Sequence, residues 1–247
     1  MNEEALKRIE EEKKKRTGRL DLSDLALMAI PEEVTKMEWL TYIDARLNHI
    51  SDISPIQGLS NLTQLYFERN LIQNIEPISI LDNLEAISFG ANEIKDIKPI
   101  AKLKKLKSIG FTTNRIFDIS AIKQLTNLIE IYFGSNQISD ISPIQRLGKL
   151  TNIYFAFNQI SDISPIQGLK KLTNINFGNN QISDISAIQG LEKLTHIHFF
   201  KNKISDISPI QGMGNLTNIS FSSNQIFNIS PIQGLEKLTE IRFDDNQ

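Results

Sequence analysis

The chain has 247 residues, of which 40% are hydrophobic and 23% are charged, and its formal net charge is -2. This near balance gives no attractive field for nucleic acid or an anionic membrane, so neither is expected as a partner. The absence of cysteine excludes a disulfide framework and a thiolate metal site. No apolar run resembles a signal peptide or approaches the ~18 residues of a membrane span, so a cytoplasmic protein is expected.

The first predicted element is a solvated helix that caps the rest of the chain, over residues 1–16. A glutamate precedes a basic residue by four positions in five pairs, a spacing that stabilises exposed helices. The pairs are Glu3–Lys7, Glu4–Arg8, Glu10–Lys14, Glu11–Lys15 and Glu12–Arg16. Apolar residues are few in this segment, so we expect the helix to cover the open end of the array that follows.

A 22-residue repeat occupies residues 17–247, with an irregular first copy and an incomplete last one. The segment NQISDISPIQGL, from residue 158, nearly copies NQISDISPIQRL, from residue 136. One asparagine marks the same point of each copy, at Asn48, Asn70, Asn92, Asn114, Asn136, Asn158, Asn180, Asn202, Asn224 and Asn246. A period that holds without a slip predicts one elongated array that grows by adding turns.

Each repeat combines a predicted strand with a return segment. In the pattern L-x-x-I-x-F-x-x-N, as in Leu150, Ile153, Phe155 and Asn158, apolar and polar positions alternate as in a half-buried strand. After the asparagine the apolar spacing changes to three, which favours a 3₁₀-like or irregular return segment. Most repeats place a proline on this return path, where its missing N–H interrupts no strand ladder.

The motif L-x-x-I-x-F-x-x-N-x-I-x-x-I resembles the leucine-rich repeat, and its 22-residue length with I-S-D-I-S-P-I is most similar to internalin-type repeats. The resemblance covers the chain from Thr17 to its end. It implies an α/β fold, a right-handed leucine-rich repeat solenoid with a concave parallel β-sheet, a 3₁₀ or irregular convex side and an N-terminal capping helix. It also implies that the asparagine column is buried as a ladder.

Two columns of residues are expected to build the core. An asparagine amide carries donors and an acceptor, so it can pair the buried N–H and C=O groups of a bend. The sixth strand position is phenylalanine in nine successive repeats, from Phe67 to Phe243. Because neighbouring strands lie ~4.8 Å apart, these rings should stack along the core. A ligand site would be local, so the column is interpreted as packing and no cofactor is expected.

The N-terminal part carries a second, shorter resemblance. The helix, the L-D-L-S stretch from Leu20 and the I-P-E-E stretch from Ile30 are similar to the start of leucine-rich segments in cyanobacterial Roco-type GTPase proteins. This similarity covers about forty residues, and no G-x-x-x-x-G-K-[ST] motif accompanies it.

The sequence stops in the middle of a repeat, at Asn246-Gln247. A solenoid cut at this point would leave Leu238, Ile241 and Phe243 under an unpaired strand. We therefore interpret the chain as an excised or engineered piece, and self-association through this uncapped end is a further hypothesis.

The outward positions of the strands form the expected recognition surface. Exposed aromatic anchors beside polar groups are typical of protein-binding surfaces, and several fall on neighbouring strands. The predicted partner-binding residues are Tyr42, Tyr66, Glu68, Tyr132, Tyr154, Phe157, His196, His198, Phe200 and Lys201. The alternative is that these aromatic side chains only pack against one another across the strands.

The histidines do not suggest a metal or catalytic site. His196 and His198 face the same side of one strand, but two ligands make a poor zinc site. His49 lies far along the array from this pair, and no nucleophile and base are expected in one enclosed pocket. The sequence therefore predicts neither metal-ligating nor catalytic residues, and the protein is not expected to be an enzyme.

The leading functional hypothesis is a non-catalytic interaction scaffold that binds a protein or peptide partner through its concave face. One alternative is an excised sensor or scaffold segment of a larger GTPase-type regulatory protein. Another is an engineered or idealised repeat protein without a native partner.

Overall fold

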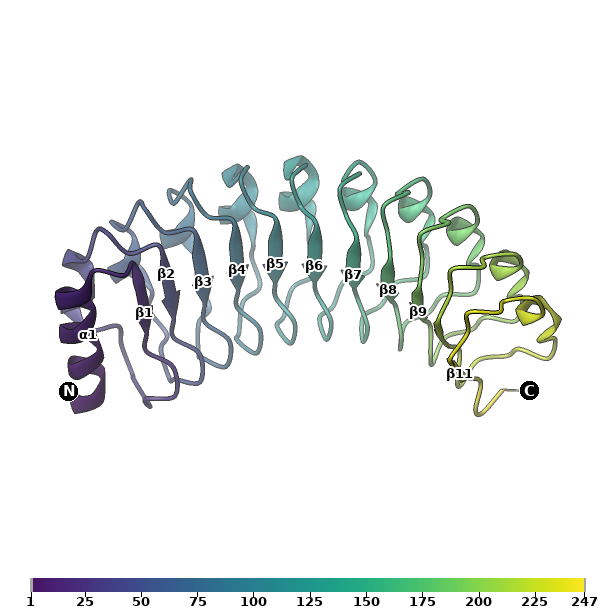
Figure 1. The fold of residues 1–247 in the computed structure, drawn as a ribbon, viewed down its shortest axis with the longest axis horizontal. Coiled ribbons are helices and arrows are strands. Elements are labelled where there is room, and N and C mark those ends of the chain that lie inside the picture. Colours follow the sequence, from purple (N-terminus) through teal and green to yellow (C-terminus); the bar gives the residue numbers. More distant parts are fainter. Residues whose placement is uncertain (1, 247) are drawn as a thin grey trace. The chain divides into compact units, whose positions relative to one another are not determined.

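The computed structural model describes residues 2–246, which form two compact units over residues 2–127 and 128–246. In each unit the strands lie side by side on one side of the coil, and the 3₁₀ turns lie on the other (Figure 1). No helix within the described residues is long and apolar enough to cross a membrane. The predicted division into a cap over 1–16 and an array over 17–247 stays a prediction.

Unit 1 begins with an α-helix and continues as alternating strands and 3₁₀ turns. Its elements are α1 (Glu3–Lys15), β1 (Arg19–Asp21), η1 (Glu32–Lys36), β2 (Tyr42–Asp44), η2 (Ser54–Ile56), β3 (Gln64–Tyr66), η3 (Glu76–Ile78), β4 (Ala86–Ser88), η4 (Lys98–Lys102), β5 (Ser108–Gly110) and η5 (Ser120–Gln124). Strands β1 to β5 pair in sequence order and in parallel.

Unit 2 repeats the same alternation of strands and 3₁₀ turns, without an α-helix among its described residues. Its elements are β6 (Glu130–Tyr132), η6 (Ser142–Ile144), β7 (Asn152–Tyr154), η7 (Ser164–Ile166), β8 (Asn174–Asn176), η8 (Ser186–Ile188), β9 (His196–His198), η9 (Ser208–Ile210), β10 (Asn218–Ser220), η10 (Ser230–Ile232) and β11 (Glu240–Arg242). Strands β6 to β11 are parallel, and each residue pairs with the one a single repeat later, as Tyr132 does with Tyr154. These strands and turns confirm the predicted leucine-rich repeat solenoid.

The asparagine column forms the predicted ladder, but only Asn48, Asn70, Asn92 and Asn224 are buried, whereas rungs such as Asn158 are half-buried. The Asn158 amide nitrogen donates to the carbonyl oxygens of Phe133, at 2.9 Å, and Phe155, at 3.0 Å. Its amide oxygen accepts from the Ile138 N–H at 3.0 Å. One side chain thus binds backbone groups of two successive turns, at the point where the chain bends away from the strand.

The phenylalanine column fills the core of each unit. The rings of Phe67 to Phe221 are fully buried. Successive ring centroids lie 5.6 and 5.9 Å apart from Phe67 to Phe111 in unit 1. In unit 2 they lie 5.6–5.8 Å apart from Phe133 to Phe243, with planes within 17° of parallel. Because these distances exceed the ~4.8 Å strand spacing, the rings stack with an offset, the geometry that aromatic pairs prefer.

Helix α1 is fixed to unit 1 by a buried carboxylate. Glu12 is 5% exposed and accepts hydrogen bonds from the Gly18 N–H at 2.8 Å, from Trp39 Nε1 at 3.0 Å and from the Thr17 hydroxyl. The predicted Glu12–Arg16 pair is therefore wrong. Arg16 ends the helix in the left-handed conformation, with φ of 47°, and its guanidinium lies 4.5 Å from the centre of the Trp39 ring.

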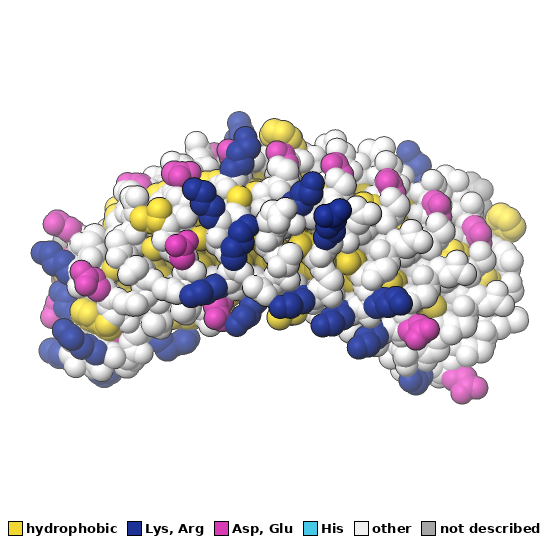
Figure 2. Space-filling view, turned by 90° about the horizontal axis from the view of Figure 1, so that it is seen from above, with side chains coloured by type: hydrophobic (Ala, Val, Ile, Leu, Met, Phe, Trp, Pro, Cys, Tyr) yellow, Lys and Arg dark blue, Asp and Glu magenta, His cyan; other side chains and the backbone are white. Residues whose placement is uncertain are grey.

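Charged side chains gather along the edges of unit 2 and leave the middle of the face seen in Figure 2 mostly uncharged. Acidic side chains form a row along one edge. Four return segments of this unit carry an exposed aspartate, at Asp140, Asp162, Asp184 and Asp206. Basic side chains line the opposite edge. Exposed lysines such as Lys171 and Lys193 precede strands β8 and β9 in the chain. The two rows have opposite sign, so this unit has no single-sign surface.

Candidate functional site

The structure divides the predicted partner-binding residues between the two units. Tyr42, Tyr66 and Glu68 belong to unit 1. The members in unit 2 are Tyr132, Tyr154, Phe157, His196, His198, Phe200 and Lys201. Each set lies on or just after the strands of its own sheet, so each is described by itself.

Two tyrosines begin the set in unit 2. Tyr132 on β6 and Tyr154 on β7 are register partners, and their rings stack with centroids 4.8 Å apart and planes 8° from parallel. The Tyr132 hydroxyl donates to Glu130 Oε2 at 3.2 Å. Burial and the nearby Glu130 carboxylate raise the pKa of Tyr132 to about 12. This hydroxyl therefore stays protonated and donates a hydrogen bond at neutral pH.

Two phenylalanines extend this surface across the turns that follow the strands. Phe157 follows β7 and is 48% exposed, whereas Phe200 follows β9 and is partly exposed. Their ring centroids are 5.9 Å apart with an interplanar angle of 63°, an edge-to-face contact. We call Tyr132, Tyr154, Phe157 and Phe200 the aromatic strip.

A glycine on the intervening turn makes the phenylalanine contact possible. A Cβ atom built on Gly178 would lie 2.0 Å from Phe200 Cε1, so the Phe200 ring covers the place where a side chain would stand. The ring reaches Phe157 across this turn because Gly178 leaves the path open. Sequence reasoning placed both phenylalanines on the surface but missed the role of Gly178, since the direction of a ring depends on which neighbour lacks a side chain.

The two histidines lie on β9, as the register requires. His196 Nδ1 is 2.8 Å from the Thr195 hydroxyl. Burial, and secondarily the charge of His196, lower the pKa of His198, so His198 is neutral at pH 7. Within residues 2–246, no three His, Cys, Asp or Glu side chains come together in a group that could hold a metal ion.

Lys201 lies beside the aromatic strip and adds a positive charge. It directly follows Phe200, is exposed and has a positive φ of 51°. Phe157, at the equivalent point of its own turn, has φ of 59°. The turns thus hold non-glycine residues in the left-handed conformation, which is costly for a bulky residue.

The set in unit 1 combines tyrosines with arginines. The rings of Tyr42 and Tyr66 lie 5.4 Å apart, and the Arg19 guanidinium is 3.8 Å from the Tyr42 ring centre. Arg46 lies 5.9 Å from the Tyr66 ring centre and forms a two-pronged ion pair with Asp44, which is 4% exposed. Asp44 lies on β2, and the Arg46 side chain covers its carboxylate.

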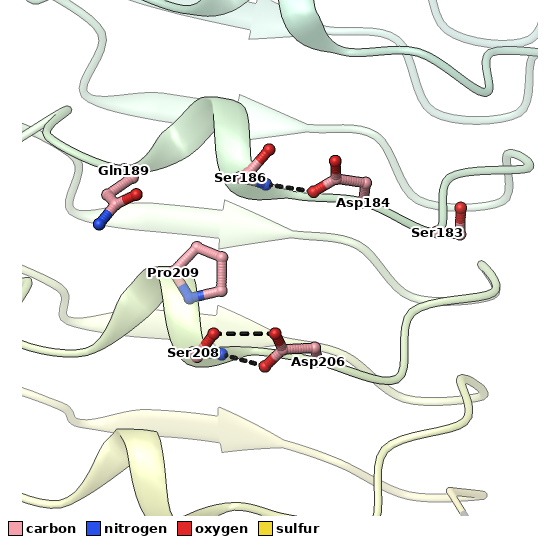
Figure 3. Close-up of a pocket in the computed structure, with 7 residues that line it drawn as sticks. All are labelled: Ser183, Asp184, Ser186, Gln189, Asp206, Ser208 and Pro209. Atoms are coloured by element: carbon pink, nitrogen blue, oxygen red, sulfur yellow. Dashed lines mark hydrogen bonds between the residues drawn. The ribbon is translucent and has the colours of Figure 1, made fainter.

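Two neighbouring return segments of unit 2 line a polar pocket. It has a volume of about 370 Å³ and lies between η8 and η9 (Figure 3). Asp184 accepts from the Ser186 N–H at 2.7 Å, and Asp206 accepts from the N–H and hydroxyl of Ser208 at 2.7 and 2.9 Å. Each aspartate accepts from the backbone N–H two residues later and forms an Asx turn that leads into the 3₁₀ turn, so these hydrogen bonds are structural.

Comparisons with known proteins identify relatives of this chain in sequence and in structure. The sequence profile of the family described as Leucine Rich repeats (2 copies) matches residues 126–168, 148–190 and 170–212. The crystal structure of an internalin C2 (inlC2) from Listeria monocytogenes has 33% sequence identity and a TM-score of 0.71, covering 77% of this chain and 83% of that chain. An internalin (inlF) from the same organism has 28% identity and a TM-score of 0.81, covering 94% of this chain and 75% of that chain.

A more distant structure shares only the fold. The leucine-rich repeat ectodomain of the plant membrane receptor kinase GASSHO1/SCHENGEN3 from Arabidopsis thaliana, in complex with CASPARIAN STRIP INTEGRITY FACTOR 2, has 17% identity and a TM-score of 0.80. That match covers 92% of this chain and 30% of the ectodomain chain. No curated protein matches the chain.

The chain belongs to the leucine-rich repeat family, whose members are typically protein-binding scaffolds and usually non-catalytic. Within that family it is similar in structure to the Listeria internalins, as the 22-residue motif predicted. The comparisons give no support to the resemblance to Roco-type GTPase proteins.

Proposed function

We propose that the protein is a non-catalytic scaffold that binds a protein or peptide partner through the outward face of the sheet in unit 2. The aromatic strip supplies the anchors, and His196, His198 and Lys201 supply polar contacts beside it. The observation that carries this proposal is the pair of Phe157, 48% exposed, and Phe200, held against it over Gly178.

The chemistry of the strip supports a binding role over simple packing. Rigid aromatic side chains offer much contact area for little loss of conformational entropy. Asn179, at the position equivalent to Phe157 on the next turn, shows that the fold needs no aromatic residue there. An exposed phenylalanine at a position where a polar residue suffices is a candidate contact for a partner.

The fold itself is compatible with this use. The plant receptor ectodomain that shares this fold is in complex with CASPARIAN STRIP INTEGRITY FACTOR 2. Its sequence identity of 17% supports a shared fold alone. An enzyme would require an activated nucleophile in an enclosed site, whereas the histidines of unit 2 lie on an open strand face.

The test is a selection of peptides from a displayed random library against the intact chain, followed by affinity measurements on purified variants. Tyr154→Ala combined with Phe157→Ala should weaken the selected peptides by roughly 10- to 100-fold, as expected when two anchors are lost. Phe227→Ser is the matched control, because Phe227 is 81% exposed on a return segment where most repeats carry serine.

The control variant should bind as the parent chain does. Selected peptides that bind the folded double variant with unchanged affinity would contradict the proposal. Loss of peptide affinity in Phe227→Ser alone would show that the peptides bind the return segments and not the aromatic strip.

A further inference from the structure

The return segments of unit 2 carry two rows of opposite charge, away from the aromatic strip. Three exposed lysines follow the turns η6, η7 and η8 and form the basic row, Lys149, Lys171 and Lys193. Three exposed aspartates precede the same turns and form the acidic row, Asp140, Asp162 and Asp184. Acidic and basic side chains of this unit line opposite edges of the face in Figure 2. Each of the three coils therefore carries one charge of each sign, on either side of its 3₁₀ turn.

The basic row lacks an acceptor that this position of the repeat has elsewhere. At the end of unit 2, Lys237 Nζ lies 2.7 Å from Oδ1 of Asn215, the equivalent residue of the preceding coil. The equivalent residue before Lys193 is Lys171, and the one before Lys171 is Lys149. Within residues 2–246, neither Lys171 nor Lys193 forms an ion pair or a side-chain hydrogen bond. Like charges on successive coils repel each other, so a row of anions would stabilise this edge.

The acidic row has hydrogen-bond donors but no cation. Asp162 accepts from the N–H and the hydroxyl of Ser164 at 2.7 and 2.9 Å, and Asp140 accepts in the same way from Ser142. None of the three aspartates forms an ion pair in the part of the chain that the structure describes. Neutral donors fix the direction of these carboxylates and leave their negative charge at the surface.

We propose that the basic row of one molecule binds the acidic row of a second copy of this chain. The strands of unit 2 pair each residue with the equivalent residue one repeat later, so both rows repeat once per coil. A second copy that is displaced along the strand direction, without rotation, has its coils level with those of the first. Each lysine of one copy then faces an aspartate of the other, and the match in spacing follows because both rows belong to the same coils.

This arrangement is a head-to-tail contact. Each molecule uses one row toward each neighbour, so the contact does not close and association continues from copy to copy. Single exposed ion pairs are weak and are screened by salt, so association is expected at low ionic strength. The inference goes beyond the proposed function, because it involves neither the aromatic strip nor a peptide.

Unit 1 does not offer the same contact. The position of the basic row is occupied there mostly by asparagine, as Asn61, Asn83, Lys105 and Asn127. A single lysine at this position cannot match a row of aspartates coil by coil. The proposed contact is therefore assigned to unit 2.

The test uses variants of the intact chain, each without one row. Asp140→Asn, Asp162→Asn and Asp184→Asn together remove the acidic row. The turns should remain, because Asn228 occupies the same position and its Oδ1 accepts from the Ser230 N–H at 2.9 Å.

A second variant removes the basic row by Lys149→Asn, Lys171→Asn and Lys193→Asn. Asparagine is compatible with this position, since Asn215 donates there to the Glu192 carbonyl oxygen at 2.9 Å. Asparagine therefore removes the charge at a position where the repeat already accepts it.

A matched control keeps both rows. Asp52→Asn, Asp96→Asn and Asp118→Asn change exposed aspartates at the equivalent position in unit 1. The control thus has the same change in net charge as the acidic-row variant, and it should associate as the parent chain does.

The measurement is sedimentation velocity over a range of protein concentrations, in about 20 mM and about 300 mM NaCl. The parent chain should form oligomers that grow with concentration at low salt, and its association constant should fall roughly tenfold or more at high salt. Each row variant alone should be monomeric. An equimolar mixture of the two row variants should form a one-to-one dimer and nothing larger, because each supplies the row that the other lacks.

A parent chain that stays monomeric at low salt would overturn the proposal. So would two row variants that fail to form a dimer with each other. Association that persists in either variant alone, or at high salt, would assign the contact to another surface, such as the end of unit 2. None of these results bears on peptide binding by the aromatic strip, which both row variants retain.

Discussion

Phe200 and Phe157 meet edge to face at 5.9 Å although a whole repeat separates their turns, because the Phe200 ring lies over Gly178. The surface of unit 2 therefore depends on a residue that has no side chain. Positions that look unrelated in the repeat alignment become coupled once the turns stack.

Substitution of Gly178→Ala should displace the Phe200 ring. The added methyl group would approach Phe200 Cε1 to 2.0 Å, and a partly exposed ring can swing away while the backbone stays in place. We expect the NOE contacts between the two phenylalanine rings to disappear, with a change of about 1 kcal/mol or less in the free energy of unfolding. Gly148→Ala, which meets open space, is the control, and persistent NOE contacts in Gly178→Ala would show the coupling to be wrong.

Removing one rung of the asparagine ladder should destabilise the chain. Asn158→Ala leaves the Ile138 N–H and the carbonyl oxygens of Phe133 and Phe155 without this partner. The expected loss in free energy of unfolding is roughly 1–3 kcal/mol, measured by urea denaturation. Asn215→Ala, which removes an exposed bond to the Glu192 carbonyl, should cost about 0.5 kcal/mol or less. Equal losses in the two variants would mean that burial does not set the strength of the ladder.

Stability should fall as the pH decreases through the ordinary histidine range. Burial, followed by the charge of His196, lowers the pKa of His198 in the folded chain. The unfolded chain then binds more protons than the folded chain below the ordinary value of ~6.5, so unfolding becomes easier as pH drops.

Urea denaturation at pH 7.5 and 5.5 should show this loss, and His198→Asn should reduce it. Asparagine is a conservative choice, because Asn176 occupies the paired position on β8. An unchanged pH dependence in this variant would show that other groups cause it.

The buried Glu12 should control the docking of α1. Burial opposes its ionisation, but hydrogen bonds from Thr17, Trp39 and Gly18 outweigh it and lower the pKa. The stabilisation is therefore present above the ordinary carboxyl pKa and is lost as the pH falls through the lower folded value. Glu12→Ala should cost roughly 1–3 kcal/mol, and the fluorescence of Trp39, the single tryptophan, should report the change.

The exposed Glu11 provides a control for this prediction. It pairs with Lys15 at 3.2 Å on the solvent side, where solvent screens the ion pair, so Glu11→Ala should leave the free energy of unfolding nearly unchanged. A Trp39 signal that is the same in both variants would contradict the docking role of Glu12.

The fold could be predicted because each position is repeated many times. The positions of Asn158 and Phe155 recur in the equivalent repeats. A structural role inferred for one repeat must therefore fit the others as well. The return segments could be predicted for the same reason, because proline and apolar residues at intervals of three recur together after the asparagine.

Features that occur only once were harder to predict. The spacing of Glu12 matches Arg16, yet the helix ends at Arg16 with a left-handed residue, so Glu12 is left facing Trp39. The path of the Phe200 ring depends on an empty position in a neighbouring turn. The burial of Asp44 depends on an arginine two residues later that folds back. Such pairings are set by tertiary contacts, which no periodic pattern records.

The left-handed residue before each ladder asparagine separates recognition from folding. From Leu47 to Asp245 this position has φ between 51° and 59°, yet its side chain is aliphatic, aromatic, basic, acidic or polar in different turns. The coil dictates the backbone angle and leaves the chemistry open, although an unfavourable conformation costs each turn some stability. One column of the array can therefore diversify turn by turn, in evolution or in a designed library, while the neighbouring asparagine and phenylalanine columns stay constant.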